Sequence, residues 1–167
     1  MNKYVLFILV MILFGFTNHR ENDGAVYYKP VLMERSKMET SIAWQDARNL
    51  EHPAKIYYKD NFIYISERYK GVHVIDNSDS TNPQNIGFIR IPGCIDMAIK
   101  NDILYADNAV DLVAIDISGS GSVSVTKRIK NVFPEILPPN LDYLPSNYDR
   151  SNRPADTEIV EWVKVSK

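Results

Sequence analysis

GVHVID at residues 71–76 and DLVAID at residues 111–116 are the stretches that decide the fold of this chain, and they lie 40 residues apart. Each is a short, mostly apolar run that ends in an aspartate, which is typical of a buried β-strand entering a turn. A strand containing a tyrosine precedes each run, with Tyr64 and Tyr105 at an interval of 41 residues. The recurrence predicts two copies of one β unit.

Each copy contains four short strands separated by turn residues. In the first unit, residues 55–93, the expected strands are 55–59, 62–66, 72–75 and 86–91. In the second unit, residues 94–131, they are 95–99, 103–106, 112–115 and 123–129. An interval of about 40 residues with four strands per unit is typical of propeller blades. We therefore predict an all-β fold of two four-stranded propeller-like blades, an incomplete β-propeller.

The segments on either side of the two units have a different character. Residues 18–54 are predicted to form a linker and one short N-terminal helix at about 33–42, because Met33, Met38 and Ile42 have a weak helical spacing. Residues 132–157 are rich in proline, which cannot donate to a strand ladder, and predict an extended loop. Residues 158–167 alternate between apolar and polar residues and predict a terminal strand, like the opening strand of a third unit.

The first 17 residues have the pattern of a signal peptide. A positive start at Lys3 precedes an unbroken apolar run from Tyr4 to Phe16, which is shorter than the roughly 20 residues of a membrane-spanning helix. Gly15 and Thr17 could flank a cleavage site, although Thr17 is a poor residue for that position. We expect an exported protein in the periplasm, cell envelope or extracellular space; a buried core helix and a retained anchor are the alternatives. Lipid anchoring is doubtful because the apolar run is not followed by a cysteine.

Composition narrows the classes of function. The net charge is −2 and no run of Lys or Arg offers a nucleic acid a basic surface. The single cysteine, Cys94, excludes an internal disulfide and a thiolate metal cluster. We expect Cys94 to be a small buried residue.

The stretches GVHVIDNSDSTNPQNIGFIRIPG (71–93) and DLVAIDIS (111–118) resemble the LVIVD repeat. The resemblance covers roughly residues 27–133 and the terminal strand, and is to a group of uncharacterised bacterial envelope proteins, often lipoproteins. It implies β-propeller architecture and an envelope location, and it carries no activity, because none is established for the group. The chain departs from the group in lacking the lipobox cysteine and in ending after about two blades; a truncated or split reading frame would explain the second departure.

A polar cluster follows the first motif. Asp76, Ser78 and Asp79 could ligate calcium through oxygen atoms, and calcium is the one cofactor that the sequence suggests. The alternative, which we favour, is that these side chains satisfy the backbone of a turn. Asp116 occupies the place of Asp76 in the second unit, which also favours a role in the turn.

Tyrosines and histidines supply the remaining candidates. Tyr69 is the best ligand-binding candidate because it lies in the turn 67–71, where a tyrosine offers rigid contact area. Most tyrosines at strand positions are expected to pack between sheets instead. His73 lies within a strand and is expected to be a hydrogen-bonded packing residue. No nucleophile or base has the context of a catalytic site, so no catalytic residue is assigned.

Three functions remain open at this level. The first is an exported binding or interaction module whose partner is a protein or a glycan at the cell envelope. The second is a fragment of a larger propeller without independent activity, and the third and weakest is a propeller-based hydrolase. Two blades alone would leave strand edges unpaired, which predicts self-association through the exposed blade edges.

Overall fold

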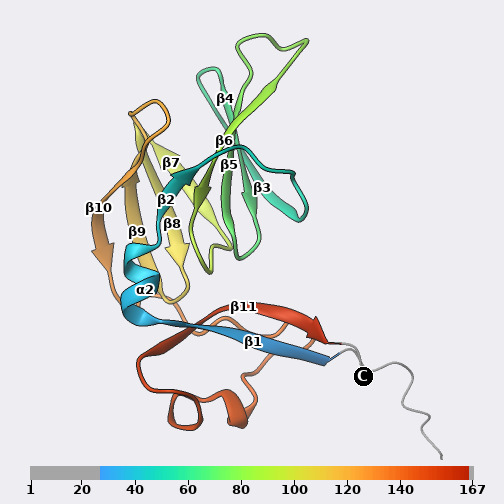
Figure 1. The fold of residues 1–167 in the computed structure, drawn as a ribbon, viewed down its shortest axis with the longest axis vertical. Coiled ribbons are helices and arrows are strands. Elements are labelled where there is room, and N and C mark those ends of the chain that lie inside the picture. The colour runs from blue at the N-terminus through green and yellow to red at the C-terminus, as the bar shows by residue number, and fades with distance from the viewer. Residues whose placement is uncertain (1–26, 166–167) are drawn as a thin grey trace, which may run out of the picture.

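The computed structural model describes residues 27–165 and has an all-β fold, as the sequence predicts. The signal-peptide prediction for residues 1–17 lies outside the described residues. Residues 27–165 form three antiparallel sheets, and none of these closes on itself. Two sheets stand side by side, and a two-stranded ribbon crosses beneath one end of both (Figure 1).

Sheet one has five strands and contains the first repeat unit. Its order is β2 (Ala43–Gln45), β6 (Gln84–Arg90), β5 (Gly71–Asp76), β4 (Phe62–Glu67) and β3 (Pro53–Lys59). Strands β3 to β6 occupy the places of the four expected strands. Strand β2 is an addition within residues assigned to the linker and helix, and it pairs with the outer strand β6 through Trp44 and Ile89.

Sheet two has four strands and contains the second repeat unit. Its order is β10 (Ser124–Ile129), β9 (Asp111–Asp116), β8 (Ile103–Asn108) and β7 (Met97–Lys100). As in sheet one, consecutive strands are neighbours, because short turns join antiparallel strands. The alternating sequence pattern therefore located all eight strands of the two units.

The ribbon corrects two expectations about the ends of the chain. Strand β1 (Tyr27–Glu34) occupies residues that the sequence pattern assigned to the linker, and it pairs antiparallel with β11 (Thr157–Val165). The terminal strand is therefore paired with β1, and within residues 27–165 it belongs to no third four-stranded unit. Helix α2 (Arg35–Thr40) follows β1 directly, and the proline-rich segment contains only the short 3-10 turns η1 (Ser146–Tyr148) and η2 (Arg150–Asn152).

The main hydrophobic core lies between sheets one and two. Sheet one contributes Tyr64, Val72 and Val74, and sheet two contributes Leu104, Val113 and Ile115. These side chains come from one face of each sheet because residues alternate between faces along a strand. Burial of this apolar surface is the main term that holds the two sheets together.

Sheet one turns the face that carries Tyr64 and Val72 toward sheet two, whereas sheet two turns the opposite face of its repeat unit toward sheet one. Tyr64 of sheet one is 7% exposed, whereas its repeat equivalent in sheet two, Tyr105, is 38% exposed. Val72 is buried, and its equivalent Leu112 is only half-buried. The face that sheet one turns toward its neighbour is therefore left open on sheet two.

A second apolar cluster joins the ribbon to the two sheets. It contains Tyr69 from the β4–β5 turn and Ala109 from the β8–β9 turn, packed against Ile159, Val160 and Trp162 of β11. The indole nitrogen of Trp162 donates a 2.9 Å hydrogen bond to the carbonyl of Ile136 in the proline-rich segment. The ribbon thus covers the same end of both sheets.

Candidate functional site

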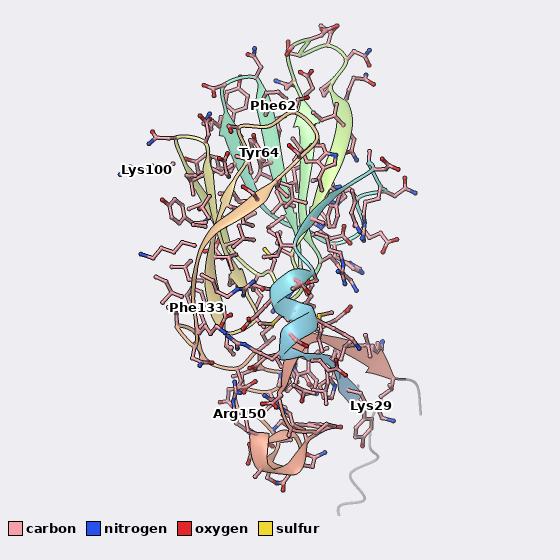
Figure 2. All side chains as sticks on the ribbon, turned by 60° about the vertical axis from the view of Figure 1, so that its left-hand side comes forward. Lys29, Phe62, Tyr64, Lys100, Phe133 and Arg150 are labelled. Atoms are coloured by element: carbon pink, nitrogen blue, oxygen red, sulfur yellow. The ribbon has the colours of Figure 1, made fainter. Side chains whose placement is uncertain are left out.

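A hollow of about 170 Å³ opens between sheets one and two, toward the end that is remote from the ribbon. Apolar side chains of sheet one form one wall, and the turn between β9 and β10 forms the other. Phe62 and Tyr64 lie toward this end of the molecule, whereas Arg150 lies at the ribbon end (Figure 2). The lining residues are Trp44, Phe62, Tyr64, Val74, Ile86, Ile89, Ile117, Ser118, Gly119, Ser120 and Gly121.

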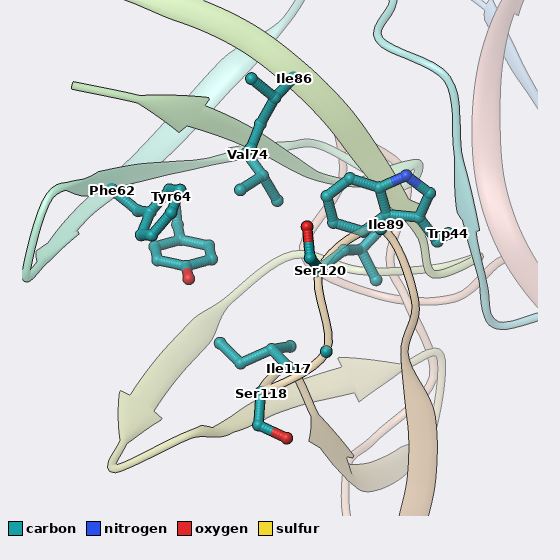
Figure 3. Close-up of a pocket in the computed structure, with 11 residues that line it drawn as sticks. Trp44, Phe62, Tyr64, Val74, Ile86, Ile89, Ile117, Ser118 and Ser120 are labelled. Carbon is teal, nitrogen blue, oxygen red and sulfur yellow. The ribbon is translucent and has the colours of Figure 1, made fainter. Parts of the chain in front are cut away.

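Trp44 is placed in the hollow by the edge strand β2 and by a glycine. Gly87 of β6 lies directly beneath the indole, and a Cβ atom on Gly87 would come within 2.0 Å of the Trp44 ring. No side chain larger than hydrogen fits there, so the ring can lie against the backbone of β6. Trp44 then faces Ile89 and the β9–β10 turn (Figure 3).

The opposite wall is held by hydrogen bonds within sheet two. The Asp116 carboxylate accepts a 2.8 Å hydrogen bond from the backbone N–H of Ser118, and the N–H of Ile117 donates to the carbonyl of Asp102 at 2.9 Å. Gly121 has a φ of +71°, a conformation that glycine adopts without strain. In Figure 3 the side chain of Ser120 faces Val74 and Trp44.

Tyr64 contributes a neutral phenol to the hollow. Burial raises the pKa of Tyr64, because the phenolate would lose its hydration. The Tyr64 ring lies 6.4 Å from that of Phe62, tilted by 53°. These two rings and Trp44 make the hollow aromatic on the sheet-one side.

The composition of the lining limits its chemistry. The described residues that line the hollow include no histidine, cysteine, lysine or acid, so its two serine hydroxyls have no base beside them there. An apolar cavity with a few hydroxyl groups is suited to holding an apolar group.

The predicted calcium residues use their oxygens within the turn that follows β5. Asp76 accepts a 2.8 Å hydrogen bond from the N–H of Ser78, and Asp79 accepts bonds of 2.9 Å and 2.7 Å from the backbone and hydroxyl of Thr81. These hydrogen bonds lower the pKa of both carboxyl groups. Within residues 27–165, no group of three or more histidine, cysteine or acidic residues is arranged to hold a metal ion.

The equivalence of Asp76 and Asp116 is confirmed. Each carboxylate accepts a 2.8 Å hydrogen bond from the backbone N–H of the residue two positions later. Such side-chain bonds replace a missing backbone partner at a tight turn. The aspartate that ends each motif therefore serves the repeat architecture.

Tyr69 lies in the turn 67–71, as expected, but not in the environment that the ligand-binding prediction assumed. Its side chain is 8% exposed and packs in the second apolar cluster, with the Arg68 guanidinium 5.1 Å from the ring centre. The reason is that the ribbon covers this end of sheet one. Tyr69 does not belong to the hollow between the sheets and offers no exposed aromatic face.

His73 and Cys94 are both buried, as predicted. His73 Nε2 lies 2.7 Å from a carboxylate oxygen of Glu67, and the other oxygen of Glu67 accepts a 2.9 Å bond from Arg48. Burial raises the pKa of the Cys94 thiol well above its ordinary value, and the nearby Asp107 raises it further. Cys94 is a packing residue with an unreactive thiol.

Sequence reasoning missed the two residues that define the hollow. Trp44 lies in a polar stretch without periodicity, so its only signal was that of a large aromatic residue among small and charged ones. Ile117 lies one residue beyond the apolar run 111–116, between the expected strands 112–115 and 123–129. Neither position reveals by itself that it faces the other sheet.

No family model, curated protein or solved structure matches the chain. Within the part of the chain that the structure describes, no helix has the length and apolar character needed to cross a membrane.

Proposed function

We propose that this chain is a binding module of the LVIVD-repeat, propeller-like kind that acts at the cell envelope and receives an apolar side chain of a protein partner. The observation that carries the proposal is the aromatic hollow between the two sheets, with Trp44, Phe62 and Tyr64 on one wall. Aromatic side chains supply large contact area at a low cost in conformational entropy.

The size of the hollow favours one side chain as its occupant. Its volume of about 170 Å³ is smaller than the roughly 300–1,000 Å³ of pockets that hold drug-sized ligands. A leucine or phenylalanine side chain presented by an extended segment is of suitable size. The partner would then be held by this anchor together with contacts around the rim.

A protein partner fits the lining better than a glycan does. Sugar hydroxyls are held largely by side chains that offer several donors and acceptors. The hydrogen-bonding side chains of this lining are only the hydroxyls of Tyr64, Ser118 and Ser120 and the indole N–H of Trp44. No amide or carboxylate side chain lines the hollow. A glycan is therefore the second candidate, supported by the aromatic rings and these few polar groups.

Peptide display with a matched pair of variants tests the proposal. Ser120→Trp places a large ring at the wall of the hollow, and Ser80→Trp places the same ring at the equivalent exposed position of sheet one, outside the hollow. We expect peptides selected on the wild type to contain a shared apolar residue, to lose binding to Ser120→Trp and to retain it with Ser80→Trp. Equal binding to both variants would refute the site, and selective binding of glycans on an array would favour the second candidate.

The envelope location rests on the sequence of residues 1–17. Fusion of these residues to a reporter that is active only after export tests it directly. We expect export of the fusion, and its loss when Leu6 and Leu13 are both replaced by arginine, because charges disrupt the apolar run. Retention of the wild-type fusion in the cytoplasm would contradict the location.

A second observation supports the propeller-like assignment and self-association. The open face of sheet two carries Tyr105 and Leu112, and β3 of sheet one exposes Ile56 and Tyr58 on its outward face, at 65% and 61%. The repeat equivalents of Ile56 and Tyr58 are Met97 and Ile99, which pack against sheet one. Sheet one of a second copy could therefore cover sheet two of the first in the way that the two sheets stack within one chain, which is a heterologous contact.

Sedimentation of the full chain over a range of concentrations tests this contact. We expect concentration-dependent association that Tyr105→Glu abolishes and Tyr143→Glu leaves unchanged, since Tyr143 is an exposed tyrosine in the proline-rich segment. A monomer at all concentrations, or equal effects of the two substitutions, would contradict the stacking of two copies.

A further inference from the structure

A second hollow, of about 280 Å³, lies where sheet one meets the ribbon. It is separate from the aromatic hollow: Tyr69 and Lys70 belong to the turn at the ribbon end of β4 and β5, whereas Phe62 is at the other end of β4. Valines and a methionine of β1 and β11 form its apolar part. Its polar lining consists of Gln45, Arg48, Tyr69, Lys70, Arg90 and Glu161.

The charges around this hollow leave one cation in excess. Arg48 pairs with Glu67, and Lys70 pairs with Glu161. Arg90 donates a 3.2 Å hydrogen bond to the carbonyl of Ser41 and has no carboxylate partner among residues 27–165. Three cations against two carboxylates give a net charge of +1.

Tyr69, one of the lining residues, has a buried hydroxyl group that lacks a partner. The Tyr69 side chain is 8% exposed, and its hydroxyl makes no hydrogen bond to the described protein atoms. Leaving a buried hydroxyl unpaired is costly, so structures retain such groups where an acceptor completes them. Gln45 can donate to an anionic oxygen in the hollow directly, whereas the enclosed Tyr69 hydroxyl can donate to it only when a bound ligand opens the lining around it.

We propose that this hollow binds a small organic carboxylate with an apolar body, such as the end of a peptide chain that finishes in an aliphatic residue. Arg90 pairs with the carboxylate, the Tyr69 hydroxyl donates to it, and the valines and methionine of the ribbon contact the apolar body. The single excess positive charge matches a monoanion and leaves a phosphate dianion only half neutralised. This site goes beyond the proposed binding of an apolar side chain between the sheets, and neither depends on the other.

Titration of the full chain with N-acetyl-L-leucine, followed by ligand-detected NMR, tests the proposal. We expect saturable binding with a dissociation constant on the order of 1 mM for so small a ligand. N-acetyl-L-leucinamide, which has the same body without the charge, should bind at least about tenfold more weakly, because the charged hydrogen bonds are lost. Inorganic phosphate should compete poorly.

Single substitutions test which residues bind the carboxylate. Arg90→Gln should weaken binding of N-acetyl-L-leucine about tenfold or more, and Tyr69→Phe about threefold to tenfold. Lys127→Gln removes an exposed cation on β10 and should leave binding unchanged. Thermal unfolding of each variant shows whether it is folded, and Tyr69→Phe retains the ring and its packing, so it tests the hydroxyl alone.

Four results would overturn the proposal: no saturable binding of the carboxylate, equal binding of the amide, tighter binding of phosphate, or unchanged binding by both Arg90→Gln and Tyr69→Phe. Ser120→Trp, which fills the hollow between the sheets, should leave carboxylate binding unaffected. A negative result for the carboxylate site is thereby distinguished from a negative result for the hollow between the sheets.

Discussion

Replacing Asp111 with alanine should destabilise the protein strongly, because this buried carboxylate connects β9 to both α2 and β10. Both of its oxygens accept 2.7 Å hydrogen bonds from Arg35 of α2, and one accepts a 2.8 Å bond from Arg128 of β10. The backbone N–H of Asn131 donates a further bond of 3.0 Å. The side chain of Asp111 is fully buried, and those of Arg35 and Arg128 are 18% and 11% exposed.

The expected loss in the free energy of unfolding is about 3–5 kcal/mol, the range for removing one partner of a buried ion pair. The loss is large because Arg35 and Arg128, which are both largely buried, would keep their charges while losing their shared carboxylate partner. Arg35 retains bonds to Glu39 and Glu158, which places the expectation below the sum of three separate charged hydrogen bonds. Relative to a typical domain stability of about 5–15 kcal/mol, the variant would be close to unfolding.

Urea unfolding followed by circular dichroism measures this loss. Asp111→Asn keeps the shape of the side chain and an acceptor for the N–H of Asn131 while removing the charge. Its free energy of unfolding should therefore lie between those of the wild type and Asp111→Ala. Asp116→Ala is the matched control, because Asp116 ends the same strand but lies in the exposed turn. Its effect should be far smaller.

Equal effects of Asp111→Ala and Asp116→Ala would refute the reasoning. So would a wild-type midpoint for Asp111→Ala, because the ion pairs would then contribute no more than exposed ones do. A loss confined to a separate early transition would show that the ribbon and α2 unfold independently of the two sheets.

Three further predictions concern individual residues. Gly87→Ala would bring a Cβ atom within 2.0 Å of Trp44; we expect a loss of about 1–3 kcal/mol in urea unfolding and a shift in tryptophan fluorescence, and unchanged values would contradict the close contact. Because burial raises its pKa, Cys94 should react with a thiol reagent at pH 8 only after unfolding, and equal rates with and without urea would exclude its burial. Hydrogen bonds lower the folded-state pKa of Asp76 and Asp116, so their stabilisation should be present at neutral pH and lost as the pH falls below about 4. The difference in stability between the wild type and the Asp76→Asn/Asp116→Asn variant should shrink in acid, and a constant difference would contradict this assignment.

Much of the fold could be predicted because its signals are local. The eight strands of the two units alternate or run apolar between turn residues, and each motif ends in an aspartate that bonds the turn backbone. These features depend on contacts between residues close in the sequence.

The candidate sites could not be predicted in the same way. Trp44 lines the hollow only because β2 adds to the edge of sheet one and Gly87 leaves space for the ring. Tyr69 is buried only because the ribbon crosses the turn that carries it. Both outcomes depend on segments that are distant in the sequence.

The sequence by itself determined the two repeated β units, their turns and the packing roles of His73 and Cys94, because strand periodicity and turn chemistry are short-range properties. Only the tertiary structure decided that β1 pairs with β11, more than a hundred residues away, and which face of each sheet is covered. Tyr64 and Tyr105 occupy equivalent positions in the repeat, yet one is buried and the other open. The physical reason is that burial depends on the neighbouring sheet, and a sheet can be covered on a given face only where another element is placed against it.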